Sequence, residues 1–144
     1  MKILVDADAC PVRDIVKSLA KQCNIPVVML TDLSHEIFDD YATVVTVDIH
    51  ADSVDLALMN LMSCGDIVVT QDIGLASLVI SKRGVAINHY GVVYNDKNID
   101  FYVNQRYIGQ KLRKSGRYSK GPQKRTKADD QEFEVAFTTL LELG

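Results

Sequence analysis

The stretch Val5-Asp6-Ala7-Asp8-Ala9-Cys10-Pro11 decides the fold of this chain. It follows the apolar run 2–5, which predicts a short buried strand, and Pro11 predicts the start of a helix because proline favours the first helical position. Asp6 and Asp8 therefore stand at the carboxyl end of a strand, where α/β proteins bind their ligands. Residues two apart in extended chain project to the same face, so both carboxylates are expected to point the same way.

Two neighbouring carboxylates repel each other unless a proton or a cation lies between them. A site made only of oxygen ligands favours Mg²⁺ or Mn²⁺. The competing interpretation is that one aspartate caps the helix that begins near Pro11, but a cap would use only one of the two. We therefore predict a divalent-metal site that includes Asp6 and Asp8.

Outward from this stretch, short apolar runs alternate with amphipathic segments along the whole chain. The predicted strands are 2–5, 26–30, 43–47, 66–70 and 85–87, with a small hairpin at 91–94, and the predicted helices are 11–22, 54–62, 73–82, 99–114 and 128–143. Alternating strands and helices indicate βαβ units and a mostly parallel sheet with helices on both faces. We expect one three-layer α/β domain over residues 1–144, with about five strands and a basic loop at 111–127.

The composition fits a single soluble domain with a sizeable core, since 47% of the 144 residues are hydrophobic and the mean hydropathy is +0.02. No apolar run approaches the about 20 residues that a membrane-spanning helix needs, and we expect no membrane partner. The cysteines, Cys10, Cys23 and Cys64, are odd in number and widely spaced. This usage agrees with a reducing compartment, and we expect a cytoplasmic protein.

Further carboxylates follow the later strands. Asp72 comes directly after strand 66–70, and Asp52 and Asp55 begin the helix after strand 43–47. The carboxyl ends of parallel strands share one edge of a sheet, so these acids can converge there. Asp52 is better explained as a helix cap, whereas Asp55 fits a ligand and a first-turn acid favoured by the helix dipole equally well. The predicted metal and catalytic residues are Asp6, Asp8, Asp55 and Asp72, with Thr70 as a further catalytic candidate that positions a water or a ligand acid.

Basic charge is concentrated in one segment, although the net charge of the chain is −3. Residues 101–128 contain lysines and arginines but no acid, and Tyr107 and Tyr118 are interleaved with them. Cations neutralise phosphates and aromatic rings stack on bases, which favours RNA or single-stranded nucleic acid as the partner. A solvated helix end explains only 111–114. The predicted nucleic-acid-binding residues are Lys111, Arg113, Lys114, Arg117, Lys120, Lys124, Arg125 and Lys127.

Three motifs carry a family resemblance: Val5 to Val12, Gly65 to Ala76 and Lys120 to Thr126. They resemble signatures of the bacterial YaiI/YqxD family over essentially the whole chain. The core in turn resembles PIN-like and NYN-type nuclease domains, in which a parallel sheet carries acids that bind Mg²⁺ or Mn²⁺ for RNA hydrolysis.

The nuclease resemblance implies roles for individual residues. Asp6 matches the acid at the end of the first strand, Asp55 the acid that opens a later helix, and Asp72 the acid after the fourth strand. The acid that PIN domains carry on an earlier helix has no clear match here, and Asp8 is the candidate substitute.

The expected function is that of a metal-dependent nuclease acting on RNA or single-stranded nucleic acid. The metal would lower the pKa of a bound water and stabilise charge on the scissile phosphate. Two alternatives stay open at this point. One is a non-catalytic RNA-binding or ribosome-associated module, and the other is a phosphatase that uses the same metal site on small phosphorylated substrates.

Overall fold

The computed structural model describes residues 1–32, 37–48, 53–114, 116 and 124–144. The predicted cap at Asp52 and the predicted nucleic-acid contacts Arg117 and Lys120 lie outside these residues. The side chain of Arg113 lies outside them as well.

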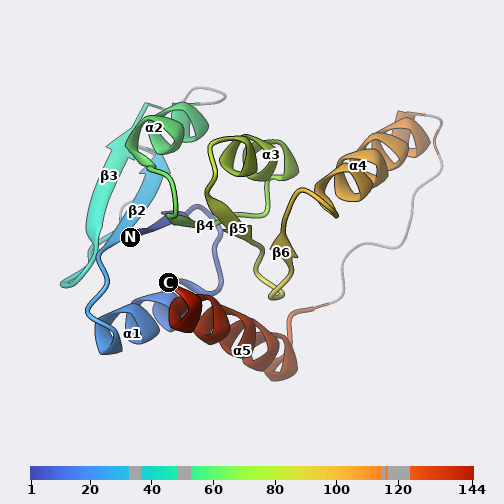
Figure 1. Cartoon of the computed structure of the whole chain (residues 1–144). Coiled ribbons are helices and arrows are strands. Elements are labelled where there is room, and N and C mark those ends of the chain that lie inside the picture. The colour runs from blue at the N-terminus through green and yellow to red at the C-terminus, as the bar shows by residue number, and fades with distance from the viewer. Residues whose placement is uncertain (33–36, 49–52, 115, 117–123) are drawn as a thin grey trace.

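In the described part of the chain, six strands form one sheet in the order β3-β2-β1-β4-β5-β6 (Figure 1). The strands are β1 (Ile3–Asp6), β2 (Val27–Asp32), β3 (Thr43–Val47), β4 (Ile67–Val69), β5 (Val85–Ile87) and β6 (Val93–Tyr94). Every neighbouring pair is parallel except β5 and β6, which are antiparallel. The predicted α/β class with a mostly parallel sheet is confirmed, and the sixth strand comes from the hairpin expected at 91–94.

The helices cover both faces of this sheet (Figure 1). They are α1 (Arg13–Gln22), α2 (Ser53–Leu61), α3 (Ile73–Ser81), α4 (Ile99–Lys114) and α5 (Lys127–Leu143). Helices α1 and α5 lie on one face and α2 and α3 on the other, while α4 continues outward from the end of β6. In the described ranges, no helix combines the length and apolar character needed to cross a lipid bilayer.

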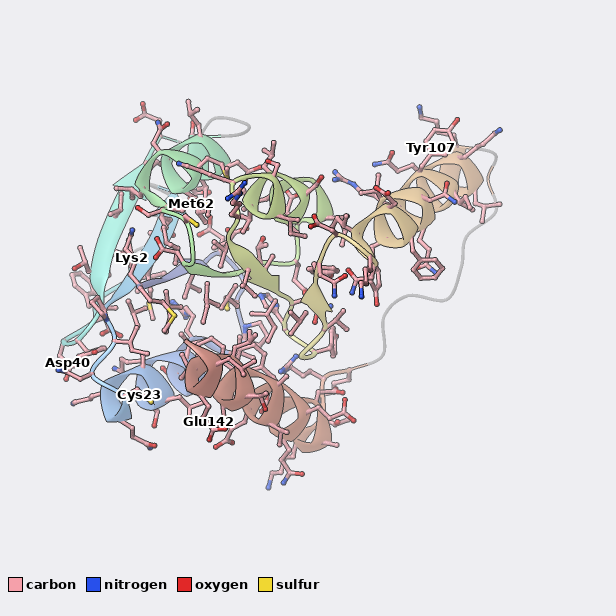
Figure 2. All side chains as sticks on the ribbon, viewed as in Figure 1. Lys2, Cys23, Asp40, Met62, Tyr107 and Glu142 are labelled. Carbon is pink, nitrogen blue, oxygen red and sulfur yellow. The ribbon has the colours of Figure 1, made fainter. Side chains whose placement is uncertain are left out.

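Strand β1 is buried on both sides because alternate residues serve different cores. Ile3 and Val5 pack in the core beneath α1 and α5, where Phe133 and Phe137 stack at 5.4 Å between ring centroids. Leu4 packs in the core beneath α2 and α3. Met62, which follows α2, belongs to this second core (Figure 2). The uninterrupted apolar run of β1 is thus the expected pattern for a central strand of a parallel sheet.

The strand order reverses at β1, and this reversal positions the site. Strands β2 and β3 continue the sheet on one side of β1, and β4, β5 and β6 continue it on the other. The chain crosses from β1 to β2 through α1 on one face, and from β3 to β4 through α2 on the other. Loops that leave β1 and β4 therefore diverge at their carboxyl ends, and such a switch point is where open α/β sheets bind ligands.

Helix α1 begins at Arg13 and not at Pro11 as the sequence predicts. Residues 11 and 12 form a turn, and Val12 occupies the N-cap position with a φ of −106°. Ala9 adopts a left-handed φ of 53°, which turns the chain out of the strand direction before the helix starts. This turn stands directly beside Asp8.

Candidate functional site

A cavity of about 370 Å³ opens at the carboxyl ends of the central strands. We name it the switch-point cavity. It is lined by Asp6, Asp8, Ala9, Pro11, Gln71, His89, Tyr90 and Arg125. These residues come from the loops that follow β1, β4 and β5, and from the segment that leads into α5. The switch-point cavity therefore lies at the predicted edge of the sheet, and its wall contains two of the predicted aspartates.

Asp6 is held by the neighbouring strand. The hydroxyl of Thr70, just after β4, donates a hydrogen bond of 3.1 Å to Asp6 Oδ2. The same Thr70 oxygen accepts a 3.0 Å hydrogen bond from the backbone N–H of Asp72. Because Thr70 is fully buried, it links the end of β1 to the start of α3 through a single fixed hydroxyl. This geometry fits the predicted role of Thr70 in positioning an acid.

Asp8 is held from the other side of β1. The Thr31 hydroxyl, near the end of β2, donates a 2.6 Å hydrogen bond to Asp8 Oδ1. Thr31 is fully buried, so its position is set by the sheet. Each carboxylate after β1 is thus oriented by a threonine of a flanking strand.

The charges around Asp6 oppose its ionisation. Burial raises the pKa of Asp6 above its ordinary value, the hydrogen bond from Thr70 acts against this rise, and the negative charges of Asp8 and Asp72 add to it. Asp8 and Asp72 are therefore close enough to Asp6 to repel its negative charge. A bound cation would relieve that repulsion.

Asp66, in contrast to Asp6, is a buried carboxylate whose negative charge is stabilised by hydrogen-bond donors. It precedes β4 at the opposite edge of the sheet, where it accepts hydrogen bonds from the Lys2 ammonium at 2.6 Å, the Lys2 backbone at 3.0 Å and the Ser63 backbone at 2.8 Å. Burial acts to raise the pKa of Asp66, but these donors outweigh it and hold the pKa below the ordinary value. Lys2 is labelled in Figure 2. Asp66 is thus stabilised as an anion, in contrast to Asp6.

The described residues suit a divalent cation that is bound by two carboxylates, but they do not provide a site made entirely of protein ligands. Among the described residues, no group of three or more histidine, cysteine or acidic side chains is arranged to hold a metal ion. Asp72 is partly engaged elsewhere, since its Oδ1 caps α3 by accepting from the Leu75 N–H at 3.1 Å and pairs with Arg106 at 3.5 Å. Mg²⁺, however, is commonly bound through one or two carboxylates while water and substrate phosphate complete its coordination. Asp6 and Asp8 suit that arrangement.

The structure does not bring Asp55, Lys111 or Lys114 together with these two aspartates. Asp55, on α2, lines a separate hollow with Leu56, Met59 and Leu78. The side chains of Lys111 and Lys114 are exposed on the outer half of α4. Tyr107 is also on the part of α4 that extends away from the sheet (Figure 2).

The basic residues at the end of the basic segment lie in two different environments: the exposed surface and the wall of the switch-point cavity. Lys124 and Lys127 are exposed to solvent. Arg125 is only 18% exposed in its side chain and lies in the wall of the switch-point cavity. One predicted nucleic-acid contact thus stands beside the predicted metal ligands, whereas the others described lie on the surface.

Sequence reasoning missed Gln71, His89 and Tyr90. Gln71 Oε1 accepts a 3.0 Å hydrogen bond from the His89 backbone N–H and so ties the loop after β5 to the loop after β4. The signal that could have found them is their position, because His89 and Tyr90 follow strand β5 just as Asp8 follows β1. Side chains after every parallel strand, and not only carboxylates, belong in such a search.

The family of the chain follows from its sequence as a whole. The model of the family described as "Uncharacterized BCR, YaiI/YqxD family" matches residues 4–143. The chain belongs to the YaiI/YqxD family.

Several relatives of this YaiI/YqxD protein cover nearly its whole length. A UPF0178 protein of Ruminiclostridium cellulolyticum is 48% identical over 141 residues, which are 98% of this chain and 92% of the relative. Another, from Clostridium acetobutylicum, is 44% identical over 146 residues, covering 100% of this chain and 99% of the relative. No solved structure gives a significant match. The resemblance predicted from the three motifs is therefore confirmed at the level of the YaiI/YqxD family.

His89 makes the stability of this YaiI/YqxD protein depend on pH. Burial, together with the positive charge of Arg125, lowers the pKa of His89 from 6.5 to about 4. Below pH 6.5 the unfolded chain binds a proton that the folded chain refuses, so the free energy of unfolding falls as the pH decreases toward 4. We expect His89 to remove about 2 kcal/mol of stability between pH 7 and pH 5.

Urea denaturation at pH 7 and pH 5 measures this loss. The control is His89→Gln, which has no group that titrates in this range and should show the smaller decrease. An equal decrease in both proteins would contradict the prediction.

Proposed function

We propose that this protein is a divalent-metal-dependent nuclease that hydrolyses phosphodiester bonds in RNA or single-stranded nucleic acid. The observation that carries the proposal is the convergence of Asp6, Asp8 and Arg125 on one cavity at the switch point of the sheet. Carboxylates that would hold a cation and an arginine that would hold a phosphate are the two halves of a phosphoryl-transfer site.

In this proposal, Asp6 and Asp8 hold Mg²⁺ or Mn²⁺ together with the substrate phosphate. The bound ion would supply an activated water and stabilise negative charge on the phosphate. Thr70 keeps Asp6 in its orientation through the 3.1 Å hydrogen bond, and Thr31 does the same for Asp8 at 2.6 Å. Asp72 adds negative charge near Asp6 while it caps α3.

Surface cations guide the nucleic acid in this proposal. Lys111, Lys114, Lys124 and Lys127 are exposed and carry charge that attracts the phosphate backbone. Their contribution is electrostatic and independent of sequence, so it weakens as salt concentration rises. A small phosphorylated substrate would show a much shallower salt dependence, which separates a nuclease from a phosphatase.

The experiment that tests the proposal is cleavage of a mixed-sequence single-stranded RNA with Mn²⁺ or Mg²⁺ and with EDTA. Cleavage that requires the metal supports the nuclease. Asp55→Asn in the same assay decides whether Asp55, which lines a separate hollow, belongs to the site. RNA binding without cleavage under any metal condition would instead favour the non-catalytic binding module.

Thr70 provides a graded test of the same site. Thr70→Val removes the hydroxyl that donates to Asp6 and accepts from the Asp72 N–H, without changing the shape of the side chain much. Because outer hydrogen bonds orient metal ligands, we expect the cleavage rate to fall by roughly 10- to 100-fold. Thr70→Ser, which keeps the hydroxyl, should restore most of the rate. A Thr70→Val protein with the wild-type rate would remove Thr70 from the mechanism.

A further inference from the structure

Two buried nitrogen atoms have no hydrogen-bond partner among the described residues: His89 Nε2 and Arg125 Nη2. Both residues line the cavity that also contains Asp6 and Asp8. His89 is only 6% exposed, so water reaches it poorly. Buried polar groups in folded proteins are almost always hydrogen-bonded, so these two nitrogen atoms require an acceptor from outside the described residues.

The guanidinium of Arg125 is held in place by a hydrogen bond and by an aromatic ring. Its Nε donates a 2.7 Å hydrogen bond to Asp130 Oδ1. Its guanidinium carbon lies 5.2 Å from the centre of the Tyr90 ring. Thr126 and Asp129 form a capping box that starts α5 directly after it. The guanidinium therefore has a defined orientation, with Nη2 left over for a further acceptor.

His89 is positioned by a tight turn between β5 and β6. Asn88 Oδ1 accepts 2.9 Å hydrogen bonds from the backbone N–H groups of Tyr90 and Val92 and so closes the turn. Gly91 has a φ of +87°, and a Cβ atom there would approach the Glu132 carbonyl oxygen to 2.9 Å. Helix α5 can pack this closely only against glycine, and the contact brings Arg125 over Tyr90 and beside His89.

The wall of the cavity carries charges of both signs. Asp6 and Asp8 supply negative charge, and Arg125 supplies positive charge. The lowered pKa of His89 leaves its imidazole neutral at pH 7, so it can donate a hydrogen bond without adding charge. An anion with several oxygen atoms matches Arg125, because a planar guanidinium binds phosphate oxygens through parallel hydrogen bonds.

We infer that Arg125 Nη2 and His89 Nε2 bind the terminal phosphate monoester of a nucleic-acid strand. A volume of about 370 Å³ is that of a small-ligand pocket and suits one nucleotide at a strand end better than a strand that passes through. The inference rests on the proposed function for the identity of the ligand as a nucleic acid. The phosphate contact itself needs neither the metal nor hydrolysis.

Binding in EDTA tests the inference without any cleavage. Three RNA hexamers of one sequence, carrying a 5′-phosphate, a 3′-phosphate or neither, are titrated by fluorescence anisotropy. We expect one phosphorylated end to bind roughly tenfold more tightly than the unphosphorylated hexamer, as for a hydrogen bond to a charged group. The hexamer that shows the preference identifies which end is recognised.

Substitutions separate recognition from simple charge attraction. Arg125→Lys keeps the positive charge but lacks Nη2, and His89→Leu has no side-chain nitrogen, so each should reduce the preference for the phosphorylated end toward onefold. Lys97→Ala removes an exposed charge that does not line the cavity and should keep the preference. Thermal unfolding measures whether each variant is folded, and His89→Leu decides the matter if Arg125→Lys does not fold.

Equal binding of all three hexamers would overturn the inference. A preference that survives both substitutions would do the same, as would an Arg125→Lys variant that weakens all three hexamers equally, because that result means contact with internal phosphates. Failure of the proposed function looks different. An end preference in EDTA without metal-dependent cleavage would contradict the proposed nuclease function and support the phosphate pocket. Metal-dependent cleavage without an end preference would support the nuclease function and contradict the phosphate pocket.

Discussion

Asp6→Asn is expected to lower metal-dependent RNA cleavage by roughly 100-fold or more, since the metal contributes several kcal/mol to phosphoryl-transfer catalysis. The substitution keeps the size and shape of the side chain and removes only its charge. Asp6 is the carboxylate on which the Thr70 hydroxyl and the charges of Asp8 and Asp72 all act. The rate is measured with a single-stranded RNA at saturating Mn²⁺.

The same substitution should not destabilise the protein. Burial and the neighbouring carboxylates make the charged form of Asp6 unfavourable in the folded state, so the neutral asparagine relieves repulsion. We expect an unfolding temperature equal to or above that of wild type. Loss of activity with retained stability distinguishes a ligand of the metal from a structural residue. Asp96→Asn, an exposed carboxylate between β6 and α4, is the matched control and should cleave normally. Wild-type cleavage by Asp6→Asn would exclude the proposed site.

Phe133→Ala is expected to lower the free energy of unfolding by about 3–5 kcal/mol, the usual cost of truncating a fully buried phenylalanine. Phe133 has no exposed surface and stacks on Phe137, and both rings attach α5 to the face of the sheet. The cavity left by the ring cannot be filled easily, since neighbours such as Ile3 and Val5 belong to the rigid central strand. Urea denaturation monitored by circular dichroism measures the loss.

Val135→Ala on the same helix is the control for Phe133→Ala. Val135 is 69% exposed, so its truncation should change stability by less than about 0.5 kcal/mol. A loss below about 1 kcal/mol in Phe133→Ala would mean that α5 does not depend on this contact. Because Arg125 directly precedes α5 and lies against Tyr90, Phe133→Ala should also weaken the preference for a phosphorylated RNA end in conditions where the protein remains folded.

The local sequence pattern was sufficient to predict the positions of most helices and strands. The predicted strands at 43–47 and 85–87 and the predicted helix at 99–114 have the bounds that the structure shows. These segments are set by side-chain periodicity and by flanking glycine or polar residues, which act over a few positions only. Strand β2 runs on to Asp32, beyond the predicted end at 30, because Thr31 and Asp32 pair with Thr46 and Val47. That pairing depends on a strand distant in the sequence.

The sequence alone determined the α/β class and the placement of Asp6 and Asp8 after the first strand. Both follow from local rules: the apolar run of β1, the turn after it and the alternation of strands with helices. Asp72 likewise follows β4 in the sequence. Since strand ends in a parallel sheet share an edge, the sequence predicted that these residues lie along that edge.

Only the tertiary structure decided which side chains share the cavity. The order of strands places Thr31 and Thr70 on either side of β1, where they hold Asp8 and Asp6. The close packing of α5 against Gly91 brings Arg125 beside His89, although the two are far apart in the chain. Such neighbours are set by long-range packing and hydrogen bonding, which local periodicity does not encode.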